Sequence, residues 1–471
     1  MLDVRKFPKG FLLGSSGSAY QYEGAWNEDG KGPSIWDVAV HEKPSRIQDG
    51  STGDVACDSY HLYKEDVKIM SYVGLDFFRF SFSWSRILPT GFPNCINQAG
   101  IDFYNNFIDE LIKHNVTPFA TIYHWDLPKQ LQELGGWTNP DVVQWFVDYA
   151  KVLFDNFGHK VKIWATINEP SMICLGGYGA GLLAPFVNAY GIGEYACAEH
   201  VLLAHAKTYR LYHEVYKGKG KVGIVLNTHW FEPVTNSKED KKAVSDIIQF
   251  ELGIYANPIY DPCGDYPEVV KKRVAAKSSE QGFPRSRLPK LSYRDLKLIK
   301  GSADFLGINM YSTYFVYRNE SVKGSYHVPS SLDDLEVGFS ITQRPFSVAT
   351  STNPRDFYKL LVKIKKLYNN PTVYITENGL SNDGGLEDDD RIEYIAGHIN
   401  ALLDAVDQGC DVRAYSVWSL LDNFEWLFGY KNKYGLYEVD FSSPKRTRTP
   451  RKSAHFYRNV TQSRSIERCD L

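Results

Sequence analysis

Residues 163–170 read Ile163-Trp164-Ala165-Thr166-Ile167-Asn168-Glu169-Pro170, an apolar run that ends in two polar residues and a proline. The run is rich in β-branched and aromatic side chains at both alternating positions, which is typical of a parallel strand buried on both faces. The strand must end near Pro170, because proline has no N–H to donate to a neighbouring strand. The segment therefore predicts a buried parallel strand with a Glu at its carboxyl end.

Seven further runs of this kind lie along the chain, at residues 11–15, 76–84, 117–125, 222–230, 304–311, 372–376 and 412–418. Amphipathic stretches alternate with them, at residues 60–73, 100–114, 141–157, 195–216, 242–256, 356–368, 392–407 and 452–460. Eight alternations of strand and helix predict an α/β protein built as a closed (β/α)₈ TIM barrel. We expect residues 1–471 to form one such domain, with long loops at the C-terminal face of the barrel. Residues 315–353 are the least regular, and we expect that segment to be the most mobile.

The net charge and the aromatic content of the chain restrict the classes of ligand that it is expected to bind. The 471 residues carry a net charge of −3, so the chain lacks the basic excess that a nucleic-acid or membrane-surface protein needs. The chain contains 26 Phe, 10 Trp and 31 Tyr. Flat rings with polar tips suit a core, and they also suit surfaces that stack against sugars. A small-molecule sugar ligand is the better expectation, and both a monomer and a homodimer remain open.

Seven cysteines are widely scattered, with no C-x-x-C pair, so we expect no zinc site and see no disulfide framework in their spacing. No metal-ligand cluster, phosphate-binding Gly loop or dinucleotide fingerprint is visible, so no cofactor is expected. The chain has no apolar run of 18 residues and no signal peptide at its start. As written, the sequence predicts a cytoplasmic protein; a processed form would be secreted.

Two predicted strands end in a similar way. The fourth ends in Asn168-Glu169 and the seventh in Glu377-Asn378. Active sites of such barrels lie where the strands end, so these two carboxyl groups are expected to converge. A pair of carboxyl groups is what glycoside hydrolysis requires, and a separation of about 5–5.5 Å corresponds to a retaining, covalent mechanism. A single Glu at a strand end is more often structural, whereas two at matching ends favour catalysis.

The other strand ends carry polar and aromatic residues that fit a sugar pocket. Arg79 lies inside an apolar strand, where a guanidinium needs a carboxylate partner. Asn309 and Tyr311 are two positions apart, hence on one face of a strand. The remaining candidates lie at the ends of the third and eighth predicted strands or shortly after the eighth, and they are His124, Trp418, Glu425 and Trp426.

Five motifs carry a specific resemblance: Ala19-Tyr20-Gln21-Tyr22-Glu23-Gly24, Tyr123-His124-Trp125-Asp126-Leu127-Pro128, Asn168-Glu169-Pro170, Thr376-Glu377-Asn378-Gly379, and the segment from Trp418 to Trp426. With them, the chain resembles the family 1 glycoside hydrolases from about Phe7 to Tyr457. Within that family it resembles the animal, especially insect, β-glucosidases, with myrosinases as close relatives. The resemblance implies a TIM barrel that hydrolyses β-D-glucosides with retention, through a covalent glycosyl-enzyme.

The resemblance also implies roles for individual residues. Glu169 corresponds to the acid/base and Glu377 to the nucleophile, while Asn168, Arg79 and Tyr311 complete the catalytic group. The residues that correspond to the substrate-binding site are Gln21, His124, Asn168, Asn309, Tyr311, Trp418, Glu425 and Trp426.

Two other functions stay open within this family. A thioglucosidase (myrosinase) acting on glucosinolates is the first, but Leu175 and Tyr314 stand where the aphid enzymes carry cations for the sulfate. If glucosinolates were the substrate, Arg318, Lys323 and Arg344 would be the first alternative cations. The second is a non-catalytic, klotho-like barrel that binds glycans or proteins; both Glu residues are present here, which disfavours it. Glu425 would repel a phosphate, so a neutral sugar is favoured over a phosphorylated one.

Overall fold

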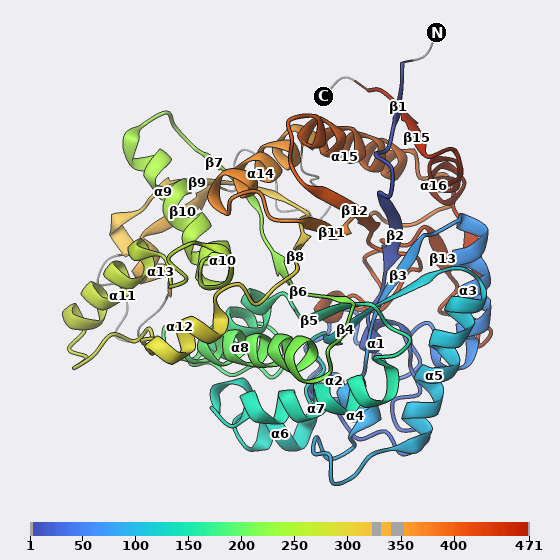
Figure 1. Ribbon diagram of the computed structural model, residues 1–471, viewed down its shortest axis with the longest axis horizontal. Coiled ribbons are helices and arrows are strands. Elements are labelled where there is room, and N and C mark those ends of the chain that lie inside the picture. The colour runs from blue at the N-terminus through green and yellow to red at the C-terminus, as the bar shows by residue number, and fades with distance from the viewer. Residues whose placement is uncertain (1–2, 323–330, 341–352, 470–471) are drawn as a thin grey trace.

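A computed structural model describes residues 3–322, 331–340 and 353–469, and its centre is a closed barrel of eight parallel strands (Figure 1). Each strand pairs with its neighbours in chain order, and the last pairs with the first. The predicted (β/α)₈ barrel is therefore confirmed. Its strands are β2 (Leu12–Ser16), β3 (Phe77–Ser81), β4 (Thr117–Tyr123), β5 (Ile163–Asn168), β6 (Lys221–Asn227), β8 (Phe305–Asn309), β11 (Val373–Asn378) and β12 (Val412–Val417).

Helices surround the barrel because each has one apolar face that must be buried. In α5 (Gln98–Lys113), for example, Ile101, Tyr104, Ile108 and Leu111 are buried at spacings of three and four residues. The other main helices of this layer are α3 (Ser59–Val73), α7 (Val142–Phe157), α8 (Gly193–Arg210), α10 (Ile254–Tyr260), α14 (Pro354–Leu367), α15 (Asp389–Asp407) and α16 (Lys452–Ser463).

The barrel lumen has its own small core. Rings of Phe77, Phe119, Phe305 and Tyr374 meet there, with Phe305 and Tyr374 stacked at a centroid distance of 4.5 Å. This cluster is separate from the large core between strands and helices. It closes the lumen beneath the strand ends, so polar side chains further along the same strands lie above a dry apolar floor.

Both strands that end in a Glu are irregular just before it. The pairing of β5 with β6 shifts between Ala165 and Asn168, and the pairing of β11 with its neighbours shifts after Ile375. Strict alternation would direct Glu377 to the face opposite Tyr374 and Thr376. Irregularities of this kind re-aim side chains, and here Glu377 faces the lumen while Asn378 hydrogen-bonds Tyr394 of α15 outside the barrel.

The long connections after β6 and β8 form a small sheet of their own. Its strands are β7 (Trp230–Pro233), β9 (Thr313–Arg318) and β10 (Val337–Ser340), in the order β10-β9-β7. The described part of residues 315–353 is thus more regular than predicted, since it also holds α13 (Ser331–Leu335). Residues 323–330 and 341–352, where the prediction of mobility also falls, lie outside the described residues. Helices α9 (Lys238–Ile248), α11 (Glu268–Glu280) and α12 (Tyr293–Ile299) complete this side.

The structure contains a disulfide that the spacing of the cysteines did not indicate. Cys174 and Cys197 form a disulfide, with a sulfur–sulfur distance of 2.04 Å. The two residues are 23 positions apart, but α8 folds back against the segment that follows β5, which brings them together. Spacing along the chain carries no sign of this proximity, because it arises only when the helix packs.

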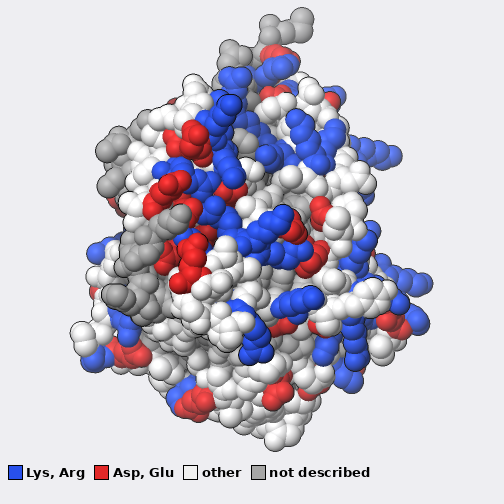
Figure 2. Space-filling model, turned by 90° about the vertical axis from the view of Figure 1, so that its left-hand side faces the viewer, with Lys and Arg blue, Asp and Glu red and all other residues white. Residues whose placement is uncertain are grey.

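The surface carries both signs of charge. On the face with α9 and α11, Lys and Arg side chains are interspersed with Asp and Glu (Figure 2). Several are paired; Lys271, for example, contacts Asp265 at 2.7 Å and Glu268 at 3.2 Å. Among the described residues, none of the helices combines the length and the apolar character that crossing a bilayer requires.

Candidate active site

A pocket of about 130 Å³ opens at the C-terminal ends of the barrel strands. It is polar on one side and aromatic on the other. Nine of the eleven candidate residues from the sequence line it, and the other two, Arg79 and Asn309, lie directly behind. The lining candidates are Gln21, His124, Asn168, Glu169, Tyr311, Glu377, Trp418, Glu425 and Trp426.

Glu377 is held by two donors. Arg79 Nη1 lies 2.5 Å from one of its carboxylate oxygens, and the Tyr311 hydroxyl donates to the other at 2.7 Å. Burial raises the pKa of Tyr311 well above its usual value, so this phenol remains a donor. Charge-assisted hydrogen bonds of this kind stabilise a carboxylate anion and orient it. The carboxylate that Arg79 required is therefore Glu377.

Glu169 has a different environment. Among the described residues, its side chain is hydrogen-bonded by the neutral amide of Asn309, whose Nδ2 donates to Glu169 Oε1 at 2.7 Å. Burial raises the pKa of Glu169 to about 8, and the negative charge of Glu377 adds to that rise. The two carboxyl groups thus differ in their surroundings in the way an acid and a nucleophile must differ, since burial favours the protonated form of Glu169 while Glu377 accepts hydrogen bonds from a guanidinium and a phenol.

Asn168 connects the two halves of this network. Its Oδ1 accepts from Arg79 Nη2 at 2.6 Å and from Asn309 Nδ2 at 3.2 Å, which leaves its Nδ2 to donate to His124 Nε2 at 3.1 Å. Burial, together with the charge of Arg79, holds the pKa of His124 well below its usual value. A neutral His124 that accepts at Nε2 carries its proton on Nδ1. That nitrogen is buried and has no hydrogen-bond partner among the described residues, so it can donate to a ligand hydroxyl.

The opposite wall combines a carboxyl group with indole rings. Glu425 accepts from Trp418 Nε1 at 3.1 Å and from Gln21 Nε2 at 3.3 Å. Burial raises the pKa of Glu425 to about 8. Trp426 lies 4.7 Å from Trp125 between ring centroids, and it is backed by Trp36 at the same distance. A sugar ring can stack on such a wall while the carboxyl group and amide bond its hydroxyl groups.

Three residues of the pocket have a left-handed backbone. They are Trp125 (φ 76°), Glu169 (φ 50°) and Trp426 (φ 52°). A residue with a side chain adopts this conformation at a cost, and such residues cluster at functional sites. Trp125 and Glu169 lie just after β4 and β5, where the chain leaves the barrel, whereas Trp426 begins a short 3-10 helix (Trp426–Phe428) further along the loop after β12.

Two lining residues were not among the sequence candidates. Trp125 follows a candidate His directly, and its Nε1 donates to the Asn168 carbonyl at 3.0 Å. Tyr434 belongs to a later loop and packs edge-on against Tyr311 at 6.0 Å. The motif containing Trp125 offered a signal for it, whereas no feature of the sequence near Tyr434 indicates a pocket residue.

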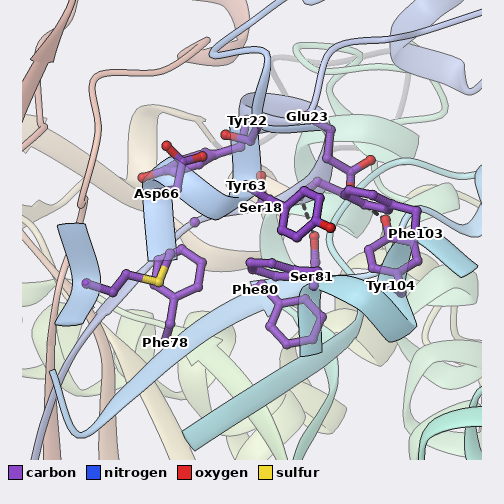
Figure 3. Close-up of a pocket in the computed structure, with 15 residues that line it drawn as sticks. Ser18, Tyr22, Glu23, Tyr63, Asp66, Phe78, Phe80, Ser81, Phe103 and Tyr104 are labelled. Atoms are coloured by element: carbon purple, nitrogen blue, oxygen red, sulfur yellow. Dashed lines mark hydrogen bonds between the residues drawn. The ribbon is translucent and has the colours of Figure 1, made fainter. Parts of the chain in front are cut away.

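A second cavity, of about 40 Å³, lies outside the barrel and away from the carboxyl pair (Figure 3). Phe78 and Phe80 of β3 face Phe103 and Tyr104 of α5 across it, and Glu23 lies at its edge. Glu23 accepts from Tyr104 and from Arg86. The second carboxylate that lines it, Asp66, accepts from Arg448, so both carboxylates are paired with arginines, and the cavity is a gap in aromatic packing.

No group of three or more His, Cys, Asp or Glu side chains suited to a metal ion occurs in the part of the chain that the structure describes.

A barrel that presents two carboxyl groups, one held by a guanidinium and one buried against a neutral amide, beside a wall of indole rings and polar side chains has the machinery of a glycoside hydrolase. The model of glycosyl hydrolase family 1 matches residues 4–466, and the chain belongs to that family. The predicted resemblance is thereby confirmed, and the protein is a retaining β-glycosidase.

Similar proteins of known sequence or structure cover the chain almost completely. Myrosinase 1 of Brevicoryne brassicae is 44% identical over 97% of this chain and 99% of its own length. Cytosolic beta-glucosidase of Homo sapiens is 41% identical over 98% of this chain and 99% of its own length. The structure of an aphid myrosinase superimposes with a TM-score of 0.92, with 97% of this chain and 99% of that chain covered. The relatives thus include proteins named myrosinase as well as proteins named beta-glucosidase.

Proposed function

We propose that this protein hydrolyses β-D-glucosides in two steps, with Glu377 as the nucleophile and Glu169 as the acid/base. The observation that carries this proposal is the contrast between the two carboxyl groups, because Arg79 and Tyr311 hold Glu377 while Glu169 is buried against a neutral amide. We also propose that residues 1–471 act as one barrel domain on a small-molecule glycoside.

In the first step, a Glu377 oxygen attacks the anomeric carbon, and the bond from that carbon to the leaving oxygen breaks. Glu169 gives its proton to the leaving oxygen, which departs as an alcohol. The glycosyl ester no longer carries the charge of Glu377, so Glu169 can now remain ionised. In the second step Glu169 takes a proton from water, whose oxygen attacks the anomeric carbon and releases Glu377.

The glycone would be held by the opposite wall. We propose that Gln21, His124 and Glu425 bond the hydroxyl groups of the sugar and that Trp418 and Trp426 pack against its ring. Asn168 would bond the 2-hydroxyl, next to the reacting carbon. These assignments are supported by the common pocket and by the buried Nδ1 of His124, which has no partner in the part of the chain that the structure describes.

Stereochemistry tests the proposal. Proton NMR of the sugar released from an aryl β-glucoside is expected to show the β-anomer first, because two inversions at one carbon give retention. An α-anomer appearing first would overturn the assignment of Glu377 as nucleophile.

Thioglucosidase activity is the second candidate, and the myrosinase relatives favour it. Against it, Leu175 and Tyr314 are uncharged, and an unpaired buried sulfate would be costly. Arg318 is committed elsewhere, since it contacts Asp246 at 2.5 Å and bonds the Leu335 carbonyl at 3.0 Å. Lys323 and Arg344 lie outside the described residues. We therefore expect kcat/KM to be higher for aryl and alkyl glucosides than for a glucosinolate, measured side by side.

Two observations bear on where in the cell the protein acts: one favours the cytoplasm, and the other favours an oxidising compartment. We propose a cytoplasmic location because a human relative is named cytosolic. The Cys174–Cys197 disulfide argues for an oxidising compartment, since disulfides are rare in the cytosol. Alkylation of free thiols in protein taken from its native source, followed by mass spectrometry, distinguishes them.

A further inference from the structure

Arg391, near the start of α15, is buried although its side chain carries a charge. Burial of a guanidinium is costly unless a carboxylate and hydrogen-bond acceptors surround it. Asp388 provides the carboxylate, in contact with Nη1. A guanidinium has five N–H donors, and all five of Arg391 are engaged. Apart from the contact with Asp388, these hydrogen bonds go to two loops beside the catalytic pocket.

The first loop follows the strand of the nucleophile. Strand β11 ends just after Glu377, and Leu380 and Asn382 lie shortly beyond its end. Arg391 Nε donates to the Leu380 carbonyl oxygen at 3.3 Å, and Nη2 donates to Asn382 Oδ1 at 2.9 Å. The guanidinium therefore holds the chain where it leaves β11.

The second loop carries Tyr434. Arg391 Nη2 donates to the carbonyl oxygen of Lys433 at 2.7 Å, and Nη1 donates to that of Gly435 at 3.1 Å. The two loops also pair directly, because the backbone N–H of Asn382 donates to the Lys433 carbonyl oxygen at 3.1 Å. One planar group thus fixes the backbone on both sides of Tyr434.

A second buried ion pair supports the same loop. Arg451 Nη1 donates to the Gly435 carbonyl oxygen at 2.7 Å, and the guanidinium bonds Asp422 at 2.9 and 2.8 Å. Asp422 in turn accepts from the backbone N–H of Gly435 at 2.9 Å. Arg451 and Asp422 are buried, like Arg391 and its carboxylate partner. Water therefore does not compete for these bonds, which makes the loop rigid.

Tyr434 connects this loop to the nucleophile. Its ring lines the catalytic pocket and packs edge-on against Tyr311, with 6.0 Å between the ring centroids. The Tyr311 hydroxyl donates to Glu377 at 2.7 Å. A displaced Tyr434 would leave the Tyr311 ring without this support, and the hydroxyl could then move away from the carboxylate that must attack.

We propose that Arg391 is a positioning residue for the nucleophile, acting through Tyr434 and Tyr311 on Glu377. Arg391 is absent from the pocket lining, so it acts on the reaction only through these neighbours. Lysine would keep the charge, but its three donors on one nitrogen cannot span two loops as the planar fork does. The inference rests on the proposed glucosidase function and adds to it a residue that does not touch the substrate.

The step that Glu377 performs can be measured by itself with dinitrophenyl 2-deoxy-2-fluoro-β-D-glucoside. A Glu377 oxygen bonds the anomeric carbon as the bond to the dinitrophenolate breaks, and this leaving group takes the electron pair and needs no proton. The glycosyl ester then persists, because fluorine at C2 disfavours the positive charge that hydrolysis develops on the ring. The amount of phenolate released counts the competent active sites, and its rate constant reports the attack.

Arg391→Lys is expected to release the same amount of phenolate per mole as the wild type, with a rate constant at least about tenfold lower, because a small misplacement of a reacting group is costly. Arg448→Lys is the matched control. Arg448 is also buried, is paired with the buried Asp66 at 2.9 Å, and bonds the carbonyl oxygen of Cys57 at 2.7 Å. None of its hydrogen-bond partners belongs to the two loops, so its substitution is expected to leave the rate constant within about twofold of the wild type.

Tyr434→Ala tests the route. It is expected to slow the same step, and the double variant with Arg391→Lys is expected to stay within about twofold of the slower single variant, because both changes act through one ring. Losses that multiply would overturn the route. If Arg391→Lys does not fold, Tyr434→Ala decides alone, since a normal rate constant would overturn the inference.

The count of active sites separates positioning from folding. An Arg391→Lys protein with fewer active sites that each react at the normal rate would show a purely structural role, and the inference would fail while the proposed function stood. If mass spectrometry of the labelled wild type found no sugar on Glu377, the proposed function itself would fail.

Discussion

Replacement of Glu169 by Gln separates the acid role of this residue from every other contribution to catalysis. Gln keeps the shape and can still accept from Asn309, but it has no proton to transfer. At pH 7 a carboxyl group with a pKa of about 8 is about nine-tenths protonated, whereas the ordinary value of 4.5 would leave under about 1%. Burial of Glu169 thus supplies nearly all of the acid form that the first step requires.

The loss must depend on the leaving group. General acid catalysis contributes about 10²- to 10⁴-fold, and an alkyl alcohol needs all of it. We expect kcat/KM of Glu169→Gln to fall by this factor for an alkyl glucoside and by less than about tenfold for a dinitrophenyl glucoside, whose leaving group needs little help. Added azide is expected to restore part of the turnover on the activated substrate, because it attacks the glycosyl ester without a base.

The pH profile is the second part of the same experiment. The pKa of Glu169 is raised, and the protonated form is the active one. Activity of the wild type, measured as kcat/KM, is therefore expected to fall as the pH rises through about 8. For the dinitrophenyl substrate, kcat/KM of Glu169→Gln is expected not to show this fall above about pH 8. If Glu169→Gln cleaved alkyl glucosides at nearly the normal rate, or still lost activity as the pH rose through about 8, Glu169 would not be the general acid.

Three further results are expected. Glu377→Gln removes the nucleophile, so turnover of aryl glucosides should fall by several orders of magnitude while circular dichroism stays unchanged; near-normal rates would contradict the assignment. Glu425→Ala should lower kcat/KM about 10- to 100-fold for glucosides and less for fucosides, which lack the 6-hydroxyl; an equal loss would mean that Glu425 does not bind that group. Replacing Cys174 and Cys197 together by Ala opens a loop of 23 residues, which should lower the free energy of unfolding in urea by about 3 kcal/mol. The control is Cys263→Ala, because Cys263 is exposed and forms no disulfide. A double variant as stable as the wild type would contradict the stabilising role of the disulfide.

The architecture was predictable because it depends on local pattern. All eight predicted strands occur within a few residues of their expected bounds, since a strand buried on both faces needs a continuous apolar run. Helices α11 and α12 and the β7-β9-β10 sheet were not predicted. Helix α11 buries few apolar residues and carries many charges, so its amphipathic pattern in the sequence is weak. Strands β9 and β10 are joined by a long connection, and the sequence therefore does not indicate which residues of the two strands pair.

The sequence by itself determined the barrel, the two Glu residues at strand ends and the polar and aromatic residues around them, because residue type and position along a strand are local properties. Only the tertiary structure decided which way Glu377 points, since alternation would have turned it outward and a shift in strand pairing turns it inward. The same holds for the contact of Arg79 with Glu377, the disulfide between Cys174 and Cys197, and the pKa of Glu169. Each depends on distances between groups far apart in the chain and on the exclusion of water around them, which exist only once the barrel has closed.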